Sequence, residues 1–189
     1  MKIESGSGNG QWAAVTKDQQ IEVLSEAASQ QHIISRRNGQ AFQIWGTATC
    51  VNGTAVVLHT KNDSEKEMVL SYIRWQILDP SGGTALPNAS NYLQVGFGTT
   101  YSSGGTEKTP INVNTGSGKL SSITTYNNDP TTTGSFDVID RHYPKAEGEM
   151  YRFNKEGAVI IPPGKTLEIN YVGDHTSGTI YSRISFYLQ

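Results

Sequence analysis

The sequence predicts an all-β protein: an antiparallel β-sandwich, with a jelly roll as the preferred topology, and an extended N-terminal arm. Three observations lead to this prediction. Small polar residues dominate, with 37 Ser and Thr, 20 Gly and 12 Asn among 189 residues, and such residues favour turns over helices. Eight to ten short segments alternate between apolar and polar residues, with turn signals between them. The length suits one domain, in which eight strands in two sheets leave room for long loops.

The N-terminal segment differs from the rest of the chain, and we assign residues 1–20 to an extended arm and residues 21–189 to the sandwich domain. Gly, Ser and Asn dominate residues 5–10, and Trp12–Val15 follows as a short apolar plug. No period in the arm is long enough for a helix or a strand. The next segment, residues 20–31, is ambiguous: it fits a short amphipathic helix, a strand or a plain connecting segment, and these interpretations remain open.

From residue 41 onward, the apolar residues recur with a period of two. Strands are expected at residues 41–51, 54–60, 68–78, 92–99, 136–142, 150–153, 158–161, 166–172 and 180–188. Asn52 and Gly53 separate the first two strands, and this pair suits a type I′ turn because both central positions need a positive φ. We therefore expect a hairpin there, and a second hairpin loop at residues 173–178.

Two further segments are interpreted as turns or loops. Asp79–Gly83 is expected to end the long third strand, because Pro80 and two glycines favour a turn. Residues 99–135 contain three clusters of loop-forming residues, with two short strands expected around Ile111 and Ile123. Since so long an irregular stretch is uncommon in a compact domain, a functional surface loop is the natural interpretation.

Charge and apolar pattern exclude several classes of partner. The net charge is −2, from 15 basic and 17 acidic residues, so no basic surplus is available to neutralise phosphates, and we expect no nucleic acid as a primary partner. No apolar stretch is long enough to span a bilayer, so no membrane is expected, and the first residues lack the apolar region of a signal peptide. The single cysteine, Cys50, excludes an internal disulfide and a cysteine-based zinc site. Such cysteine usage suits a reducing, intracellular compartment.

A search for catalytic and cofactor motifs finds none, so the sequence predicts no enzyme, no cofactor and no metal. The Gly-Lys pairs at Gly118 and Gly164 lack the glycine that a phosphate-binding loop needs five positions earlier. No serine lies in the Gly-x-Ser-x-Gly pattern of a nucleophile elbow. The four histidines are too far apart in the chain to form a local metal pair.

Three sets of residues remain as candidate sites, each with solvated surface residues as the alternative. Asp174 and His175 lie in the second predicted hairpin loop. Four carboxylates gather in the last third and would suit glycoside hydrolysis if two of them converge: Asp137, Asp140, Glu147 and Glu149. Six tyrosines would suit sugar stacking or an interface, although β-propensity explains them equally well: Tyr92, Tyr101, Tyr126, Tyr143, Tyr181 and Tyr187.

The arm is the most unusual feature of the chain. A flexible segment that carries Trp12 and Val15 adds little to the core of a monomer, but it can order on a partner by adding a strand to a sheet edge. We therefore predict that partner binding falls on six residues: Ser7, Gly8, Asn9, Gly10, Trp12 and Val15. A frayed terminus without a partner is the alternative.

Residues 4–23 (ESGSGNGQWAAVTKDQQIEV) resemble the opening of small virion proteins of tailed bacteriophages. Those proteins begin with a Ser/Gly-rich segment, followed by Ala-x-Val, polar residues and a short apolar strand. The matching residues are Ser5, Gly6, Ser7, Gly8, Ala14, Val15, Asp18, Ile21 and Val23. Residues 55–78 are similar to the segment that follows in the same proteins: a strand, a Lys-Asn loop and a long strand. Residues 159–172 resemble a turn between late strands of phage and viral β-sandwiches.

The resemblance implies a capsid decoration or cement protein of a tailed bacteriophage. Such a protein would assemble in the host cytoplasm and bind the outer head surface of the virion as a homotrimer, with the major capsid protein as partner. Several simultaneous contacts would then multiply its affinity. A receptor- or glycan-binding module of a head or tail fibre is the alternative. A β-sandwich hydrolase acting through Asp137 or Asp140 is a third hypothesis.

Overall fold

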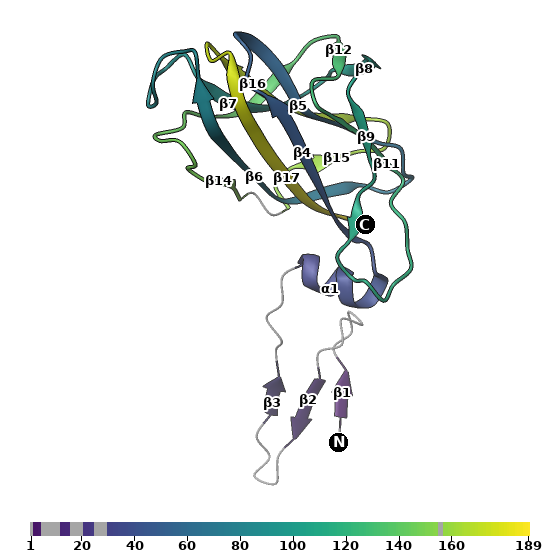
Figure 1. Cartoon of the computed structure of the whole chain (residues 1–189). Helices are drawn as coiled ribbons and strands as arrows, with labels where there is room; N and C mark the ends of the chain where they lie inside the picture. The colour runs from purple at the N-terminus through teal and green to yellow at the C-terminus, as the bar shows by residue number, and fades with distance from the viewer. Residues whose placement is uncertain (1, 5–11, 16–20, 25–29, 155–156) are drawn as a thin grey trace.

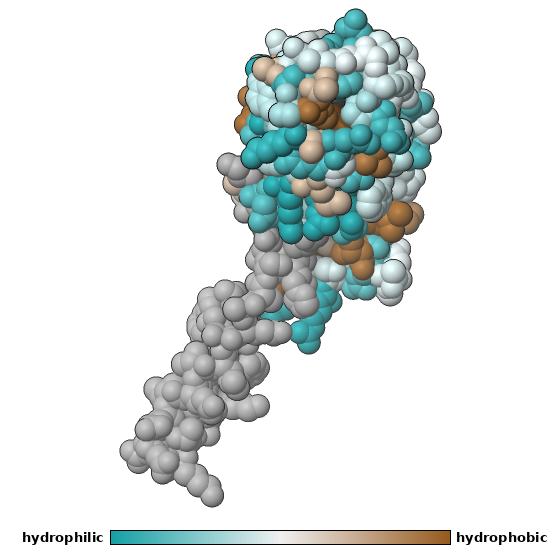
Figure 2. Space-filling view, turned by 60° about the vertical axis from the view of Figure 1, so that its left-hand side comes forward, coloured by the Kyte–Doolittle hydropathy of each residue, from teal (hydrophilic) through white to brown (hydrophobic). Residues whose placement is uncertain are grey.

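The computed structural model describes residues 2–4, 12–15, 21–24, 30–154 and 157–189. Two antiparallel sheets pack face to face and form a β-sandwich (Figure 1), so the prediction of an all-β, antiparallel sandwich is confirmed. The side of the sandwich shown in Figure 2 carries its hydrophobic residues in small separate patches between hydrophilic ones. No helix in the described part of the chain is long and apolar enough to cross a membrane.

The first sheet, called sheet I, has the strand order β10-β4-β17-β6-β14, and β15 also pairs with β6. Its strands are β4 (Ala41–Thr49), β6 (Met68–Ser81), β10 (Ile111–Asn112), β14 (Tyr151–Phe153), β15 (Ile160–Ile161) and β17 (Ser177–Leu188). The last strand of the chain, β17, therefore lies in the middle of this sheet, between β4 and β6.

The second sheet, called sheet II, has the strand order β13-β7-β16-β5-β11-β9. Its strands are β5 (Gly53–Asn62), β7 (Tyr92–Phe97), β9 (Thr106–Lys108), β11 (Ile123–Asn127), β13 (Asp137–His142) and β16 (Thr166–Gly173). A separate two-stranded sheet is formed by β8 (Thr100–Ser103) and β12 (Thr131–Thr133).

The core lies between the two sheets and follows the alternation seen in the sequence. On β4, Phe42, Ile44 and Ala48 are buried, whereas Trp45 and Thr49 are exposed. The largest buried side chains come from both sheets: Trp75, Tyr171, Phe42 and Phe186. Burial of each such apolar side chain contributes about 1.5–3 kcal/mol, and this contribution holds the two sheets together.

Both predicted hairpins are wrong. The strands on either side of Asn52-Gly53 are β4 and β5, which lie in different sheets and do not pair. Of the two turn residues, Gly53 has a positive φ of 129° and Asn52 does not, so the turn is not type I′. The loop at residues 173–178 likewise connects sheet II to sheet I. These two connections between the sheets contact each other, because the Cys50 amide donates a hydrogen bond of 3.0 Å to the Gly178 carbonyl.

The long strand β6 continues beyond the predicted turn at Asp79. Pro80 lies within it, and Ser81 still pairs with Ser177. A register shift accommodates the proline, and Asp79 takes a positive φ of 50° there. The chain turns only afterwards, at the two glycines. Pro80 thus occupies a strand irregularity, one of the few places where a sheet tolerates proline.

Residues 99–135 contain more regular structure than the two short strands expected. Five strands fall in this segment, β8 to β12. Three of them, β8, β9 and β12, are short and polar, and their residues are mostly exposed. These three strands lack the apolar alternation from which a strand is recognised, because β9 is the edge strand of sheet II and β8 and β12 form the small separate sheet.

The N-terminal region contains three strands, β1 (Lys2–Glu4), β2 (Trp12–Val15) and β3 (Ile21–Leu24), in an antiparallel sheet of order β1-β2-β3. The expectation that the arm has no strands is therefore wrong, and residues 21–24 form a strand and not a helix. Residues of the arm pair directly with the segment assigned to the sandwich domain, since Trp12 lies opposite Leu24. Figure 1 draws this sheet beyond α1, apart from the two large sheets.

One helix, α1 (Gln30–Asn38), joins the N-terminal strands to the sandwich and was not predicted. It ends at Gly39, which has a φ of 61° and whose amide donates a hydrogen bond to the Ser35 carbonyl. Together these form a left-handed C-terminal cap. Ile34 of the helix packs with Val69 and Tyr187 on the outer side of sheet I. This contact fixes the C-terminal half of α1 to the sandwich.

Candidate functional site

Two adjoining hollows lie beside β5, β8 and the turn before β16. One has a volume of about 390 Å³ and is lined mainly by His59, Lys61, Asp63, Tyr101 and Tyr126. The other has a volume of about 380 Å³ and runs between residues 97–100 and 160–166. Because Thr100, Gly164 and Thr166 line both hollows, we treat them as one surface and call it the tyrosine groove.

The aromatic part of the tyrosine groove is a stacked pair of rings. Tyr101 of β8 and Tyr126 of β11 lie parallel, with ring centroids 3.7 Å apart and an interplanar angle of 4°. The Tyr101 hydroxyl donates to the Gly104 carbonyl at 3.1 Å, which fixes its ring further. The His59 ring lies 6.4 Å from that of Tyr101. Both tyrosines remain partly exposed, so they offer aromatic surface to a ligand.

A buried polar cluster lies under the rings and holds β8 against sheet II. The Thr99 hydroxyl donates to Glu168 Oε2 at 2.7 Å, and Asn170 Nδ2 donates to Glu168 Oε1 at 2.8 Å. The Thr99 carbonyl accepts a hydrogen bond of 2.7 Å from the Thr166 hydroxyl. Thr99 therefore binds β16 through both its side chain and its backbone. Since it immediately precedes β8, this residue sets the position of Tyr101.

His59 is the buried titratable group of the tyrosine groove. It is 1% exposed and lies between Tyr126 and Glu168 in the strand register. Its Nε2 lies 3.4 Å from the Thr99 carbonyl, whereas its Nδ1 has no hydrogen-bond partner among the described residues. Burial lowers the pKa of His59, although the Thr99 carbonyl and the Glu168 carboxylate oppose this shift. The ring is therefore neutral at neutral pH.

An ion pair forms the polar rim of the tyrosine groove. Lys61 Nζ lies 2.5 Å from Asp63 Oδ1, and both side chains are partly exposed. Burial alone would raise the pKa of Asp63, but hydrogen bonds from Lys61 and Thr124 lower it overall. The rim thus offers a carboxylate and an ammonium group beside aromatic rings. Aromatic faces with a few fixed polar groups suit a ligand that has both apolar C–H faces and hydroxyls, as a sugar does.

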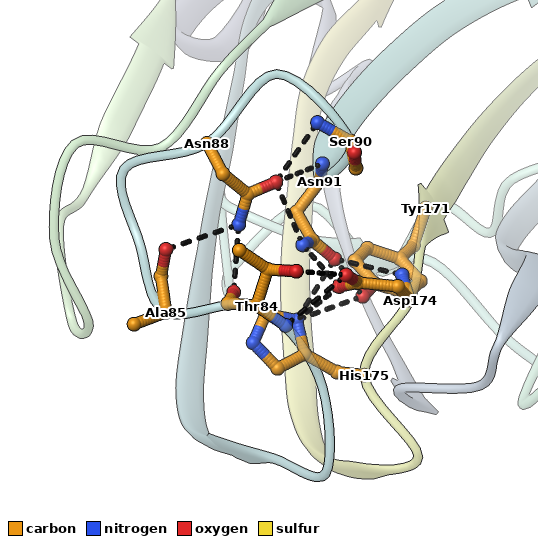
Figure 3. A network of polar contacts seen from close by, with 8 residues as sticks. All are labelled: Thr84, Ala85, Asn88, Ser90, Asn91, Tyr171, Asp174 and His175. Carbon is orange, nitrogen blue, oxygen red and sulfur yellow. Dashed lines mark hydrogen bonds and ion pairs between the residues drawn. The ribbon is translucent and has the colours of Figure 1, made fainter.

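The predicted Asp174-His175 pair belongs to a different region (Figure 3). His175 is only 2% exposed, so the alternative of two solvated loop residues is wrong for it. The Asn91 Oδ1 atom accepts from the Tyr171 hydroxyl at 2.5 Å and from His175 Nδ1 at 2.8 Å. Burial raises the pKa of Tyr171.

The Asp174 carboxylate completes this network. Its Oδ2 atom accepts from the Thr84 hydroxyl at 2.6 Å, and its Oδ1 atom accepts from Asn91 Nδ2 at 2.5 Å. These hydrogen bonds, led by that of Thr84, hold the pKa of Asp174 at about 2. The network ties the loop before β7 to the crossing between β16 and β17 (Figure 3), which is a structural role.

Two of the four predicted carboxylates hold the loop between β13 and β14. Glu147 accepts a hydrogen bond of 3.1 Å from the Asp79 amide. Glu149 accepts one from the Lys145 amide and lies 3.9 Å from His142 Nε2. Asp137 and Asp140 are on β13, at the edge of sheet II. Among the described residues, no group of three or more His, Cys, Asp and Glu side chains is placed to hold a metal ion.

The other predicted residues fall in several places. The tyrosine groove brings together Tyr101 and Tyr126. The ring centroids of Tyr92 and Tyr143 lie 5.3 Å apart, near β13. The prediction of Tyr187 as a surface residue is wrong, because it is buried against α1. Of the predicted arm residues, Trp12 and Val15 begin and end β2. The remaining four lie outside the described residues: Ser7, Gly8, Asn9 and Gly10.

Sequence reasoning missed His59, Lys61, Asp63 and Glu168 as members of a site. The strand alternation placed His59 and Glu168 on strands, but it could not show that β8 would cover them. Comparison of the sequence with models of protein families and with curated proteins finds no match. The functional argument therefore depends on the chain's own geometry.

Proposed function

We propose that the protein is a structural component of a tailed-bacteriophage particle: a decoration or cement protein that binds the outer surface of the head. In this proposal it assembles in the host cytoplasm as a homotrimer and contacts the major capsid protein. The observation that supports it best is the N-terminal sheet drawn apart from the sandwich in Figure 1. Its edge strands, β1 and β3, each have one side without a strand partner in the described part of the chain. Such edges can pair with a strand of another protein.

The jelly-roll topology is part of the proposal, and the strand order supports it. Eight strands divide into β4-β17-β6-β14 and β5-β16-β7-β13. Successive strands of the chain fall in alternate sheets at β4/β5 and β16/β17. A double-sheet arrangement of eight strands with such crossings is the jelly-roll pattern found in capsid proteins.

A head-binding experiment tests the proposal. Purified protein is added to heads that lack it, and co-sedimentation is measured for the natural sequence and for Ala14→Pro. Because Ala14 lies in the middle strand of the N-terminal sheet, proline there removes a backbone donor from the ladder, in a position where a sheet does not tolerate proline. We expect the natural protein to bind and Ala14→Pro to lose binding, while Leu120→Pro, in an exposed loop, binds normally.

Two results would count against this function. If the natural protein does not bind heads, the decoration role is wrong. If Ala14→Pro binds as well as Leu120→Pro, the N-terminal sheet is not the binding element. Circular dichroism of both variants shows whether the sandwich has stayed folded.

The second candidate function is a receptor- or glycan-binding module, and the tyrosine groove favours it. Stacked rings beside an ion pair provide the apolar and polar contacts that a sugar needs. Binding of the isolated protein to a glycan panel tests this function, with Tyr101→Ala and Tyr126→Ala expected to abolish any signal. Tyr143→Ala, an exposed tyrosine outside the groove, is the matched control. A signal that survives both groove variants would exclude the groove.

A further inference from the structure

The register of sheet I places three arginines and a tryptophan in one row. Trp45 on β4 lies opposite Arg183 on β17, which lies opposite Arg74 on β6, which lies opposite Arg152 on β14. Directly opposed residues point to the same side of a sheet, and neighbouring strands are about 4.8 Å apart. Three of the six arginines of the chain therefore line up on the outer side of sheet I. We call these four residues the arginine row.

Aromatic rings hold the arginine row in place. The Cζ atoms of Arg152 and Arg74 lie 4.5 Å and 5.0 Å from the centroid of the Tyr72 ring. Arg183 Cζ lies 4.6 Å from the Trp45 ring, and its Nη2 atom also donates to Gln43 Oε1. Cation–π contacts of this kind orient a guanidinium group without cancelling its charge.

No carboxylate faces the arginine row from the strands that carry it. The outward residues of β4, β17 and β6 are all uncharged apart from two arginines: Gln43, Trp45, Thr47, Thr49, Thr179, Tyr181, Arg183, Ser185, Tyr72, Arg74, Gln76 and Leu78. Within the described residues, none of the three arginines forms an ion pair with Asp or Glu. This face is therefore positively charged in a protein whose net charge is −2. Like charges directly opposite each other destabilise a sheet, so the arginine row has a cost in stability.

Exposed apolar side chains border the arginine row. Trp45, Met150 and Tyr181 are 52%, 59% and 36% exposed. Together with Arg74 and Arg183, they line a hollow of about 70 Å³. Trp, Tyr, Met and Arg are the residue types enriched in the energetically important parts of protein interfaces. A sugar or a free phosphate would gain little from Met150, whereas an apolar side chain of a peptide would.

We propose that the outer face of sheet I, around the arginine row, is a docking surface for an acidic segment of a partner protein. Carboxylates of that segment pair with Arg74, Arg152 and Arg183, and one apolar side chain enters the hollow beside Trp45. The backbone of β17 and β6 is already paired on both sides, so the segment binds through side chains and adds no strand. This surface is separate from the N-terminal sheet and from the tyrosine groove, so the inference does not depend on the phage role.

A peptide-binding experiment with the whole protein tests the proposal. The probe is a short fluorescent peptide of Glu residues with one central Leu, and binding is followed by anisotropy at low salt. We expect binding that weakens as salt rises. We expect Arg74→Gln and Arg183→Gln each to weaken it by about tenfold, because each removes a charge-assisted pair. Arg141→Gln is the matched control, since Arg141 also lies over a tyrosine ring, but on β13 of sheet II.

Further measurements make the proposal refutable. Thermal unfolding establishes that every variant is folded at the temperature of the binding assay, so that a loss of binding reports the removed charge. Equal binding by Arg74→Gln and Arg141→Gln would overturn the proposal. Tighter binding of a DNA oligonucleotide or an acidic polysaccharide than of the peptide would overturn its assignment to a protein partner. An oligomer that Arg183→Gln dissociates, seen by sedimentation, would show that a second copy occupies the face and would overturn it also.

Discussion

Thr99 should control both the stability of the sandwich and the shape of the tyrosine groove. Its hydroxyl donates at 2.7 Å to Glu168, a carboxylate that is buried under β8. The substitution Thr99→Val keeps the shape of the side chain and removes only this donor. The backbone contact with the Thr166 hydroxyl remains, because it uses the Thr99 carbonyl.

The expected loss follows from the nature of the bond. A hydrogen bond to a charged group contributes about 1.5–3 kcal/mol. After Thr99→Val, Glu168 retains the hydrogen bond from Asn170 on its other oxygen, so the buried carboxylate loses one hydrogen bond and keeps the other. The free energy of unfolding should therefore fall by about 1.5–3 kcal/mol.

Urea unfolding followed by tryptophan fluorescence measures this change. The control is Thr100→Val, the same substitution at the next residue, whose side chain is exposed. In a Glu168→Gln background the effect of Thr99→Val should fall to about 0.5–1.5 kcal/mol, because the acceptor is then neutral. If Thr99→Val and Thr100→Val unfold with the same free energy, Thr99 does not hold β8 and the reasoning is refuted.

Three other predictions concern pH and packing. Hydrogen bonds, first that from Thr84, hold the pKa of Asp174 at about 2. The stability that they contribute is complete above about pH 4 and is lost as the pH falls towards 2. In acid titrations of the free energy of unfolding, Asp174→Asn should flatten this decline. Burial lowers the pKa of His59, so the unfolded chain takes up a proton first and stability falls as the pH drops below about 6.5; His59→Gln should remove part of that slope in urea titrations at several pH values. A Cβ at Gly96 would lie 2.7 Å from the Phe136 ring, so Gly96→Ala should cost about 1–3 kcal/mol by calorimetry, and an unchanged melting temperature would contradict this close contact.

The parts of the fold that could be predicted are those fixed by burial along one strand. Phe42, Ile44 and Ala48 face the core because an alternating pattern can satisfy only one such arrangement. Which strand pairs with which depends on contacts distant in sequence. The Asn52-Gly53 turn looked like a hairpin locally, yet the amide of Cys50 pairs with Gly178 of the other crossing.

The candidate sites depend even more on contacts between segments that are distant in sequence. Tyr101 and Tyr126 were recognised as exposed aromatics, but their stacking depends on how β8 folds over sheet II. Arg74, Arg152 and Arg183 each look unremarkable on separate strands. Only the register of sheet I shows that they stand in one row. The alternation therefore assigns a residue to a strand face, and it cannot assign that residue its neighbours.

The central position of β17 has a consequence for how the chain folds. Until this strand has been synthesised, β4 and β6 have no common neighbour, and their inner faces expose Phe42, Ile73 and other core residues to water. Pairings between segments so distant in sequence form slowly, and the exposed apolar strands are open to aggregation in the meantime. Sheet I therefore closes only after translation has delivered β17, and until then its exposed strands are the part of the chain most open to aggregation.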